Sequence, residues 1–342
     1  MGDIAILSED ELRRCVTLDT AAVDCVEAAF VALARGEVVM PPILSMAIAE
    51  HNGEIDVKTA HVRGLDSFAV KMSPGFFDNP ALGLPSTSGL MVLFSARTGM
   101  LEALLLDDGY LTDVRTAAAG AVAARHLARA DASRACVVGA GTQAALQLAA
   151  LCLTRPITHA DIWARDPGRA EALAARATRE LGIVATAVTD REAAVRAADI
   201  VVTTTPSGEP LIEAEWLCPG QHVTAMGSDQ PHKNELRPEC LVRADRYVPD
   251  RRAQTALLGE LHHALAAGLI DAAATFPELG DVASGRAAGR VSPEEITVCD
   301  LTGTGVQDTA IATYARRRAE ALASERSSEP DAAPDGDAAT TR

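Results

Sequence analysis

The spacing of apolar residues near the start of the chain predicts an amphipathic helix. Apolar side chains recur every three or four positions up to residue 33, and Gly36 follows as a natural stop. This spacing places them on one face, so we expect the first helix to run from Thr20 to Arg35. The residues that form this face are Val23, Val26, Phe30 and Leu33.

Between Asp56 and Leu106 the apolar residues instead form short runs, separated by Gly, Pro and Asn turns. Runs of this length are typical of strands, and the loop "SARTG" joins the last two as a hairpin. We therefore expect a meander of mostly antiparallel strands. The four runs are "DVKTAHV", "SFAVKMS", "GLMVLFS" and "MLEALLL".

From Arg134 to Asp300 strand-like runs alternate with helical segments, which predicts a parallel sheet wrapped by helices. A last helix, about Val306 to Ala323, follows "LTGTG" and could return to the first part of the chain. The expected fold is therefore α/β. It combines a Rossmann-type doubly wound parallel sheet with an α+β domain that has a mostly antiparallel sheet. The domain boundaries we predict are 129–304 for the first, and 1–128 plus 305–323 for the second.

Composition excludes several classes of protein. The formal net charge of −16 opposes binding to nucleic acid or to an anionic membrane. No apolar run reaches the ~20 residues of a membrane span. Seven scattered cysteines without a C-x-x-C pair, and an N-terminus unlike a signal peptide, favour reduced thiols and a cytoplasmic location. No residue cluster has the spacing of a metal site, and residues 324–342 are expected to be disordered.

The stretch "GYLTDVRTAAAGAVAARHL" reads as an alanine-rich helix with a misplaced charge. Thr112 is the expected N-cap, which makes Asp113 the first helical residue and puts Arg115 in the first turn. A cation there faces the positive end of the helix dipole. Arg115 either forms an ion pair, with Asp113 or Asp56, or binds a carboxylate together with the free backbone N–H groups.

The segment "ACVVGAGTQAALQ" predicts a dinucleotide site, because G-x-G-x-x-A lies between a strand and a helix. The next strand ends in "WARDPGR". Arg165 there would suit the 2′-phosphate of NADP, whereas Asp166 would suit NAD or cap the following helix. We therefore expect NAD(P)(H), with NADP(H) slightly favoured. The candidate cofactor-binding residues of this part are Gly139, Gly141, Thr142, Gln143, Arg165 and Thr204.

Two further residues are candidates for catalysis. Lys71 ends the alternating strand "SFAVK", where it is either a solvated charge or a carboxylate ligand. Asp229 lies in "VTAMGSDQPHKNEL", after a parallel strand and hence at the edge of the sheet where ligands bind. An acid there can exchange a proton with a substrate amine, or simply form a turn before Pro231.

These motifs resemble the ornithine cyclodeaminase/mu-crystallin family over about residues 10 to 322. Within it, "SPGFFDNPALGLPS" and "DLTGTGVQDTAIA" are most similar to the ectoine-utilisation (EutC-type) branch. The segments on which the family resemblance rests are "LTDVRTAAAGAVAARHLA", "VVGAGTQAALQ", "TAMGSDQPHKNEL", "GEL" (Gly259 to Leu261) and "DLTGTGVQD".

The resemblance implies roles for individual residues. Lys71 and Arg115 would hold the substrate carboxylate, Asp229 would act on the amine, and Asp56 would lie near the substrate. Thr302 and Gly303 would lie near the nicotinamide. Residues 1–128 and 305–323 would bind substrate and form a homodimer through their sheets. Many members carry an arginine directly after the paired prolines, but this chain has Ile43, which puts ornithine as substrate in doubt.

The chemistry implied is hydride transfer between a Cα–N centre and a nicotinamide. Three outcomes use the same groups: an amino acid dehydrogenase, an imine reductase and a cyclodeaminase that releases ammonia. The resemblance to the ectoine branch favours a small imino or diamino acid. A second alternative is an NADP-dependent small-molecule binder without turnover, as mu-crystallin-type proteins can be.

Overall fold

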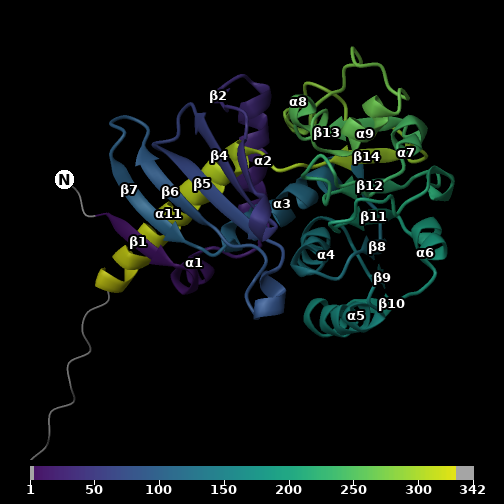
Figure 1. Cartoon of the computed structure of the whole chain (residues 1–342), viewed down its shortest axis with the longest axis horizontal. Helices are drawn as coiled ribbons and strands as arrows, with labels where there is room; N and C mark the ends of the chain where they lie inside the picture. The colour runs from purple at the N-terminus through teal and green to yellow at the C-terminus, as the bar shows by residue number, and fades with distance from the viewer. Residues whose placement is uncertain (1–3, 329–342) are drawn as a thin grey trace, which may run out of the picture.

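Two sheets organise the chain in the computed structural model, which describes residues 4–328 (Figure 1). The first half contributes one seven-stranded sheet, and residues 134–300 contribute a second. Of the two long helices, α3 (Tyr110–Leu127) lies at the junction of the two halves, whereas α11 (Gly305–Ser328) begins near the junction and runs across the first sheet. The predicted α/β class with two different sheets is confirmed.

The first sheet is antiparallel except where β1 pairs with β7. Its order is β1-β7-β6-β5-β4-β2, with β3 also paired to β4, and α11 packs across β4 and β5. The strands are β1 (Ala5–Ser8), β2 (Val38–Val39), β3 (Leu44–Ile48), β4 (Gly53–Val62), β5 (Ser67–Phe76), β6 (Leu90–Ser95) and β7 (Leu101–Leu106). Between β1 and β2 the chain forms the helices α1 (Glu9–Cys15) and α2 (Thr20–Ala34), and short 3-10 turns follow at Ala49–His51 and Asn79–Leu82.

Strand alternation gives this sheet two different faces. Lys58 on β4 and Lys71 on β5 are opposite each other in register, and both are buried on the face that α11 covers. Their neighbours Val57 and Met72 also face each other, but on the opposite side of the sheet. The register therefore places two lysines beneath α11 and an apolar surface on the outer face.

The second sheet is entirely parallel, in the order β10-β9-β8-β11-β12-β14-β13. The order reverses between β8 and β11, so their carboxyl ends form the switch point where such folds bind ligands. The strands are β8 (Arg134–Val138), β9 (His159–Trp163), β10 (Val184–Ala187), β11 (Ile200–Thr203), β12 (His222–Ala225), β13 (Arg246–Pro249) and β14 (Thr297–Asp300). The helices are α4 (Thr142–Thr154), α5 (Pro167–Leu181), α6 (Arg191–Ala197), α7 (Glu239–Arg243), α8 (Arg252–Thr255), α9 (Glu260–Ala266) and α10 (Leu279–Ala283), and a 3-10 turn spans Ala214–Trp216.

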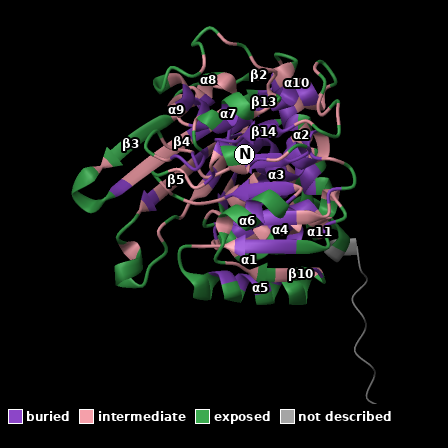
Figure 2. Cartoon of the chain, turned by 90° about the vertical axis from the view of Figure 1, so that its right-hand side faces the viewer, coloured by how far each residue is buried: buried purple, intermediate pink, exposed green. Residues whose placement is uncertain are grey.

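Helix α3 connects the two sheets and is buried along most of its length (Figure 2). Its alanines let α2 and α4 approach closely. The predicted N-cap at Thr112 is wrong, because the helix already begins at Tyr110 with Gly109 as cap. The carboxylate of Asp107 accepts the N–H of Leu111 at 2.9 Å, which fixes this earlier start. Arg115 therefore lies in the second turn, away from the strongest part of the helix dipole.

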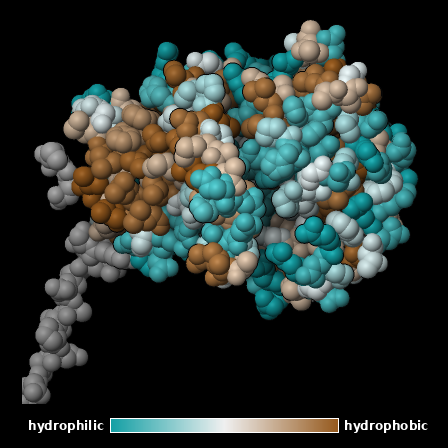
Figure 3. Space-filling model, viewed as in Figure 1, coloured by the Kyte–Doolittle hydropathy of each residue, from teal (hydrophilic) through white to brown (hydrophobic). Residues whose placement is uncertain are grey.

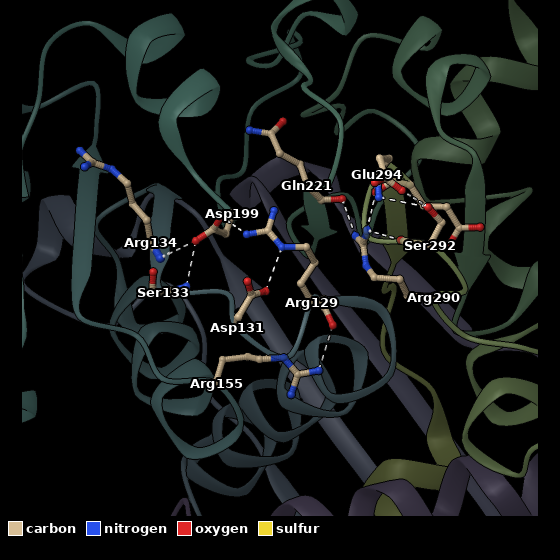
Figure 4. Close-up of polar contacts among 12 residues, drawn as sticks. Arg129, Asp131, Ser133, Arg134, Arg155, Asp199, Gln221, Arg290, Ser292 and Glu294 are labelled. Atoms are coloured by element: carbon tan, nitrogen blue, oxygen red, sulfur yellow. Dashed lines mark hydrogen bonds and ion pairs between the residues drawn. The ribbon is translucent and has the colours of Figure 1, made fainter.

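The other end of α3 is held by arginines and one aspartate. Arg155 donates to the carbonyls of Arg125 and Ala128, and Arg290 donates to the carbonyl of Leu127. Cations at this end satisfy carbonyls that the helix leaves free. Asp199 then fixes the connection to β8 by accepting from Arg129 and from two backbone N–H groups (Figure 4).

Two terminal predictions need correction. The helix from Thr20 is the second of the chain, because α1 precedes it with Ser8 and Glu11 forming a capping box. Helix α11 extends to Ser328, five residues beyond the expected end, so residues 324–328 are helical. The rest of the tail that we expected to be disordered, 329–342, lies outside the described residues.

The start of α11 depends on a residue without a side chain. A Cβ on Gly305 would lie 2.6 Å from the carbonyl oxygen of Thr59 on β4, a backbone atom that cannot turn aside. We predict that Gly305→Ala lowers the free energy of unfolding by about 1–3 kcal/mol, because it forces α11 away from the sheet.

Urea unfolding followed by circular dichroism measures this change. Ala321→Ser, at an exposed position on the same helix, should change the free energy of unfolding by less than about 0.5 kcal/mol. Equal stability of the Gly305→Ala protein and the wild type would contradict the close approach of α11 to β4.

Candidate active site

A cavity of about 360 Å³ lies between the two sheets. The inner face of β4 and β5 forms one wall, and the loops after β11, β12 and β14 form the other. Most of the candidate site residues line this one cavity, although they come from distant parts of the chain. They are Asp56, Lys71, Arg115, Gln143, Thr204, Asp229, Thr302 and Gly303.

The cationic end of the cavity is built around Asp308, a residue that the sequence analysis missed. Its carboxylate lies 3.0 Å from Nε of Arg115 and 3.3 Å from Nζ of Lys71. The side chain of Asp308 is 0% exposed, so this is a buried ion cluster. The expected partners of Arg115 are therefore wrong: Asp113 instead accepts from the amide of Gln143.

Backbone groups complete this end of the cavity. The ammonium of Lys58 donates to the carbonyl oxygen of Gly303 at 3.1 Å. A Cβ at Gly303, whose φ is +78°, would lie 2.7 Å from Nη1 of Arg115. Glycine at this position thus allows the backbone after β14 to lie against the guanidinium.

Burial controls the protonation of the cluster. Burial lowers the pKa of Lys71 to about 7; Asp308 opposes this shift, while Arg115 and Lys58 add to it. Burial alone would raise the pKa of Asp308, but Lys71, Arg115 and Lys58 outweigh it, so that pKa is lowered. Asp308 therefore stays ionised, and the cluster retains an excess of positive charge that can hold an anion.

Lysine is used in this chain only at the cavity. The sequence has three lysines among its 31 lysines and arginines, and Lys58, Lys71 and Lys233 all line the same cavity. A lysine changes its pKa readily when buried, whereas an arginine stays charged. This distribution is a signal in the sequence that could have identified Lys58 and Lys233 as site residues.

The opposite end of the cavity is acidic. The carboxylate of Asp229 lies 2.6 Å from Nζ of Lys233, and its side chain is 48% exposed. Partial burial acts to raise the pKa of Asp229, but the charge and hydrogen bond of Lys233 outweigh it, so that the pKa is lowered. The amide of Gln230 bridges Glu54 and Asp56 on β4, at 3.3 and 3.4 Å. Asp229 is therefore ionised, and the adjacent residue Gln230 contacts the acidic residues of the first sheet.

The glycine turn after β8 has no room for a side chain at its first glycine. Gly139 has a φ of +129°, and a Cβ there would lie 2.4 Å from Oγ1 of Thr204. A second cavity of about 440 Å³ begins at this turn. It shares Thr204, Thr205 and Pro206 with the first cavity, so a long ligand can extend from one to the other.

The far end of the second cavity carries the residues expected to distinguish the two cofactors. Arg165 and Arg169 both line it, and neither has an ion-pair partner among the described residues. Asp166 caps α5 by accepting the N–H of Gly168 at 2.9 Å, as one of our alternatives expected. Thr142, the first residue of α4, lines neither of these cavities but a third one beside the glycine turn, together with Gly141 and Arg169.

The predicted absence of a metal site and of a membrane span can be compared with the structure only over the described residues. Within residues 4–328 no group of three or more metal-binding side chains comes together. In the same range no helix is both long and apolar enough to span a membrane. Ile43, which replaces an arginine found in many family members, is not among the residues that line the cavity.

Fold and cavities define a class: a protein with a Rossmann-type half that faces a cavity with three buried cations at one end. The ornithine cyclodeaminase/mu-crystallin family model matches residues 4–322. The chain belongs to this family. The related proteins found by comparison are NAD(P)-dependent reductases, dehydrogenases and cyclodeaminases, consistent with an enzyme acting on amino or imino acids.

Three similar proteins carry three different activities in their names. An uncharacterized cyclodeaminase of Sinorhizobium fredii is 59% identical over 94% of this chain and 97% of its own. An archaeal alanine dehydrogenase dimer with bound NAD is 34% identical, with a TM-score of 0.87, over 94% of this chain and 97% of that one. The Thermococcus litoralis Δ1-pyrroline-2-carboxylate reductase, in complex with NADH and L-proline, is 28% identical, with a TM-score of 0.89, over 94% and 98%.

The three lysines allow a direct test of the cationic end. In protein labelled with ¹³C-lysine, we predict that one side-chain signal titrates with a midpoint near pH 7, because burial beside Arg115 and Lys58 disfavours the charged form of Lys71. NMR spectra recorded between pH 5.5 and 9.5 measure this midpoint.

The assignment needs a matched variant. Lys71→Arg should remove only the signal with the low midpoint and leave the other two. If all three lysines stayed protonated up to pH 9, the proposed electrostatics of the cluster would be wrong.

Proposed function

We propose that this protein catalyses hydride transfer between the Cα–N centre of a small amino or imino acid and a nicotinamide cofactor. The observation that carries the proposal is the content of one cavity. A carboxylate-binding cluster and an ionised aspartate line it together, and it joins the cavity that begins at the glycine turn. These are the groups that such a reaction requires.

The residues have separate tasks in this mechanism. Lys71 and Arg115 hold the substrate carboxylate and so fix the position of its Cα. Asp229, ionised beside Lys233, takes the proton of the amine during oxidation or returns it during reduction. A bound nicotinamide supplies or accepts the hydride. Thr302 and Gly303 line the cavity where the reacting end of the cofactor would lie.

The direction of the reaction depends on the substrate. Hydrolysis of the imine product gives a dehydrogenase, and the reverse reaction gives an imine reductase. The acidic end of the cavity favours a second candidate, a cyclodeaminase, because Glu54 and Asp56 could hold a second amine that attacks the imine and releases ammonia. A role in ectoine catabolism is supported only by the resemblance of "SPGFFDNPALGLPS" to that branch.

We also propose NADP(H) as the preferred cofactor. Arg165 and Arg169 line the end of the cavity where the adenosine ribose would lie, and a 2′-phosphate would neutralise them. The acid that could bind the ribose hydroxyls, Asp166, already caps α5. NAD is the cofactor named for the solved alanine dehydrogenase, so both forms need to be compared.

A substrate screen tests the function. Small amino acids, diamino acids and imino acids are incubated with NAD(H) and NADP(H), while absorbance of the reduced cofactor and free ammonia are measured. For the best substrate, Asp229→Asn should lower kcat by at least 100-fold because no base remains, and cofactor affinity should stay within about threefold.

The outcomes separate the alternatives. Net reduced cofactor identifies a dehydrogenase, consumption with an imine a reductase, and ammonia without net reduction a cyclodeaminase. Cofactor binding without any turnover would favour the mu-crystallin-type binder. Undiminished turnover by the Asp229→Asn protein would remove Asp229 from the mechanism.

We propose further that residues 1–128 and 305–323 form the substrate and dimerisation domain. The outer face of the first sheet is apolar, and Figure 3 shows a hydrophobic surface over this region. The side chains on this face alternate with buried ones along β5, β6 and β7. An apolar face that is only partly covered within the chain is typical of an interface, and the similar alanine dehydrogenase is described as a dimer. Members of the patch are Phe68, Val70, Met72, Leu90, Val92, Phe94, Leu104 and Leu106.

Sedimentation velocity tests this assembly. The wild type should sediment as a dimer, and Val92→Asp should give a folded monomer, because a charge would be buried at the centre of the patch. Thr98→Asp, in the exposed hairpin loop next to the patch, serves as the control and should remain dimeric. A dimeric Val92→Asp protein would place the interface elsewhere.

A further inference from the structure

Two buried carboxyl groups lie behind the cavity and outside the mechanism described so far. Glu235 is 0% exposed and Glu260 is 1% exposed. No lysine, arginine or histidine forms an ion pair with either of them within residues 4–328. Every hydrogen bond they accept comes instead from a backbone N–H or a hydroxyl group.

Glu235 joins the loop after β11 to the loop after β12. One carboxylate oxygen accepts the backbone N–H and the hydroxyl of Thr205, at 2.5 and 2.8 Å. The other accepts the hydroxyl of Thr203 and the N–H of Gly227, both at 2.7 Å. Thr205 lines both cavities, and Gly227 comes two residues before Asp229.

Glu260 secures the same loop from the other side. At the start of α9, its carboxylate accepts the N–H groups of Glu235 and Leu236, at 2.9 and 3.1 Å, and the hydroxyl of Ser228. Ser228 directly precedes Asp229. The two carboxyl groups therefore hold the loop that carries Asp229 at both of its ends.

The two loops pack closely at Gly227, where there is no space for a side chain. A Cβ on Gly227 would lie 2.2 Å from the carbonyl oxygen of Thr205 and 2.5 Å from the Glu235 carboxylate. Burial raises the pKa of Glu235, and burial with the nearby charges of Asp300 and Glu235 raises that of Glu260. So costly an arrangement in the interior needs a reason beyond stability.

We propose that Glu235 and Glu260 are positioning residues that set the distance between Asp229 and the cofactor loop at Thr204–Thr205. They touch neither substrate nor cofactor. The proposed carboxylate ligands Lys71 and Arg115 are on β5 and α3, outside this pair of loops, so the hydrogen bonds of Glu235 and Glu260 do not hold the residues that would bind the substrate carboxylate. The inference rests on the proposed function and adds to it the residues that align its base.

Glu235→Gln is the first test, because an amide has one acceptor oxygen where the native carboxylate has two, and its NH₂ would face an N–H. We expect kcat to fall about 10- to 100-fold, since a misplacement of about 1 Å suffices for such a loss. KM for the substrate should change less than threefold. The acid limb of the kcat pH profile, set by Asp229, should shift, which a purely structural defect would not produce.

Two further variants keep the test decisive. Ser228→Ala removes the hydroxyl that donates to Glu260. It should lower kcat several-fold even if Glu235→Gln proves unstable. Glu213→Gln, at a surface acid paired with Arg237, is the control and should behave like the wild type. Fluorescence titration with reduced cofactor gives the fraction of folded sites, to which every kcat is normalised.

The results distinguish this inference from the function on which it rests. A wild type that turns over, with Glu235→Gln and Ser228→Ala unchanged in normalised kcat and pH profile, overturns the inference alone. A KM that rises by the same factor as kcat falls also overturns it, because such a result indicates general damage to the cavity. A wild type without turnover on any amino or imino acid overturns the proposed function and the inference together.

Discussion

The carboxylate of Asp308 between Lys71 and Arg115 is the interaction on which the cavity depends. Taking a lysine and an arginine out of water is costly unless an opposite charge is close by. One buried carboxylate meets that need only in part, because Lys58 adds a third cation to the same end. The positive charge that remains is the feature that would attract the carboxylate of an amino acid. The contact that makes burial of the cations possible therefore also leaves them able to bind a ligand.

This contact also determines how the chain is folded around the cavity. Arg115 and Asp308 are 193 positions apart, and they meet only because the chain leaves the first sheet through α3 and returns to it through α11. The return requires close packing, which the glycines at 303 and 305 allow. The whole parallel sheet lies between these two helices in sequence, so its loops reach the cavity from the opposite side. A base on such a loop can then approach a ligand that the first sheet holds.

Local patterns were sufficient to predict much of this structure. The glycine turn was predictable because a strand, two glycines and a helix are consecutive in sequence, and the strands followed from alternation. Lys71, Arg115 and Asp229 were candidates because each is a charged side chain beside an expected element boundary. In the structure Lys71 instead lies in the middle of β5 and Arg115 in the second turn of α3. Asp308, Glu235 and Glu260 were missed because nothing near them in sequence reveals their partners, most of which lie 24 or more positions away. The start of α3 was misplaced because Asp107, outside the expected helix, supplies the hydrogen bond that fixes it.

The central claim is that a hydride moves between the substrate Cα and the nicotinamide while Lys71 and Arg115 hold the carboxylate. It is tested most directly by following deuterium from an amino acid labelled at Cα, using the substrate found by screening. The account predicts that the label appears in the reduced nicotinamide, or returns to Cα of the product when ammonia is released. Loss of the label to solvent, at a rate equal to turnover, would contradict it.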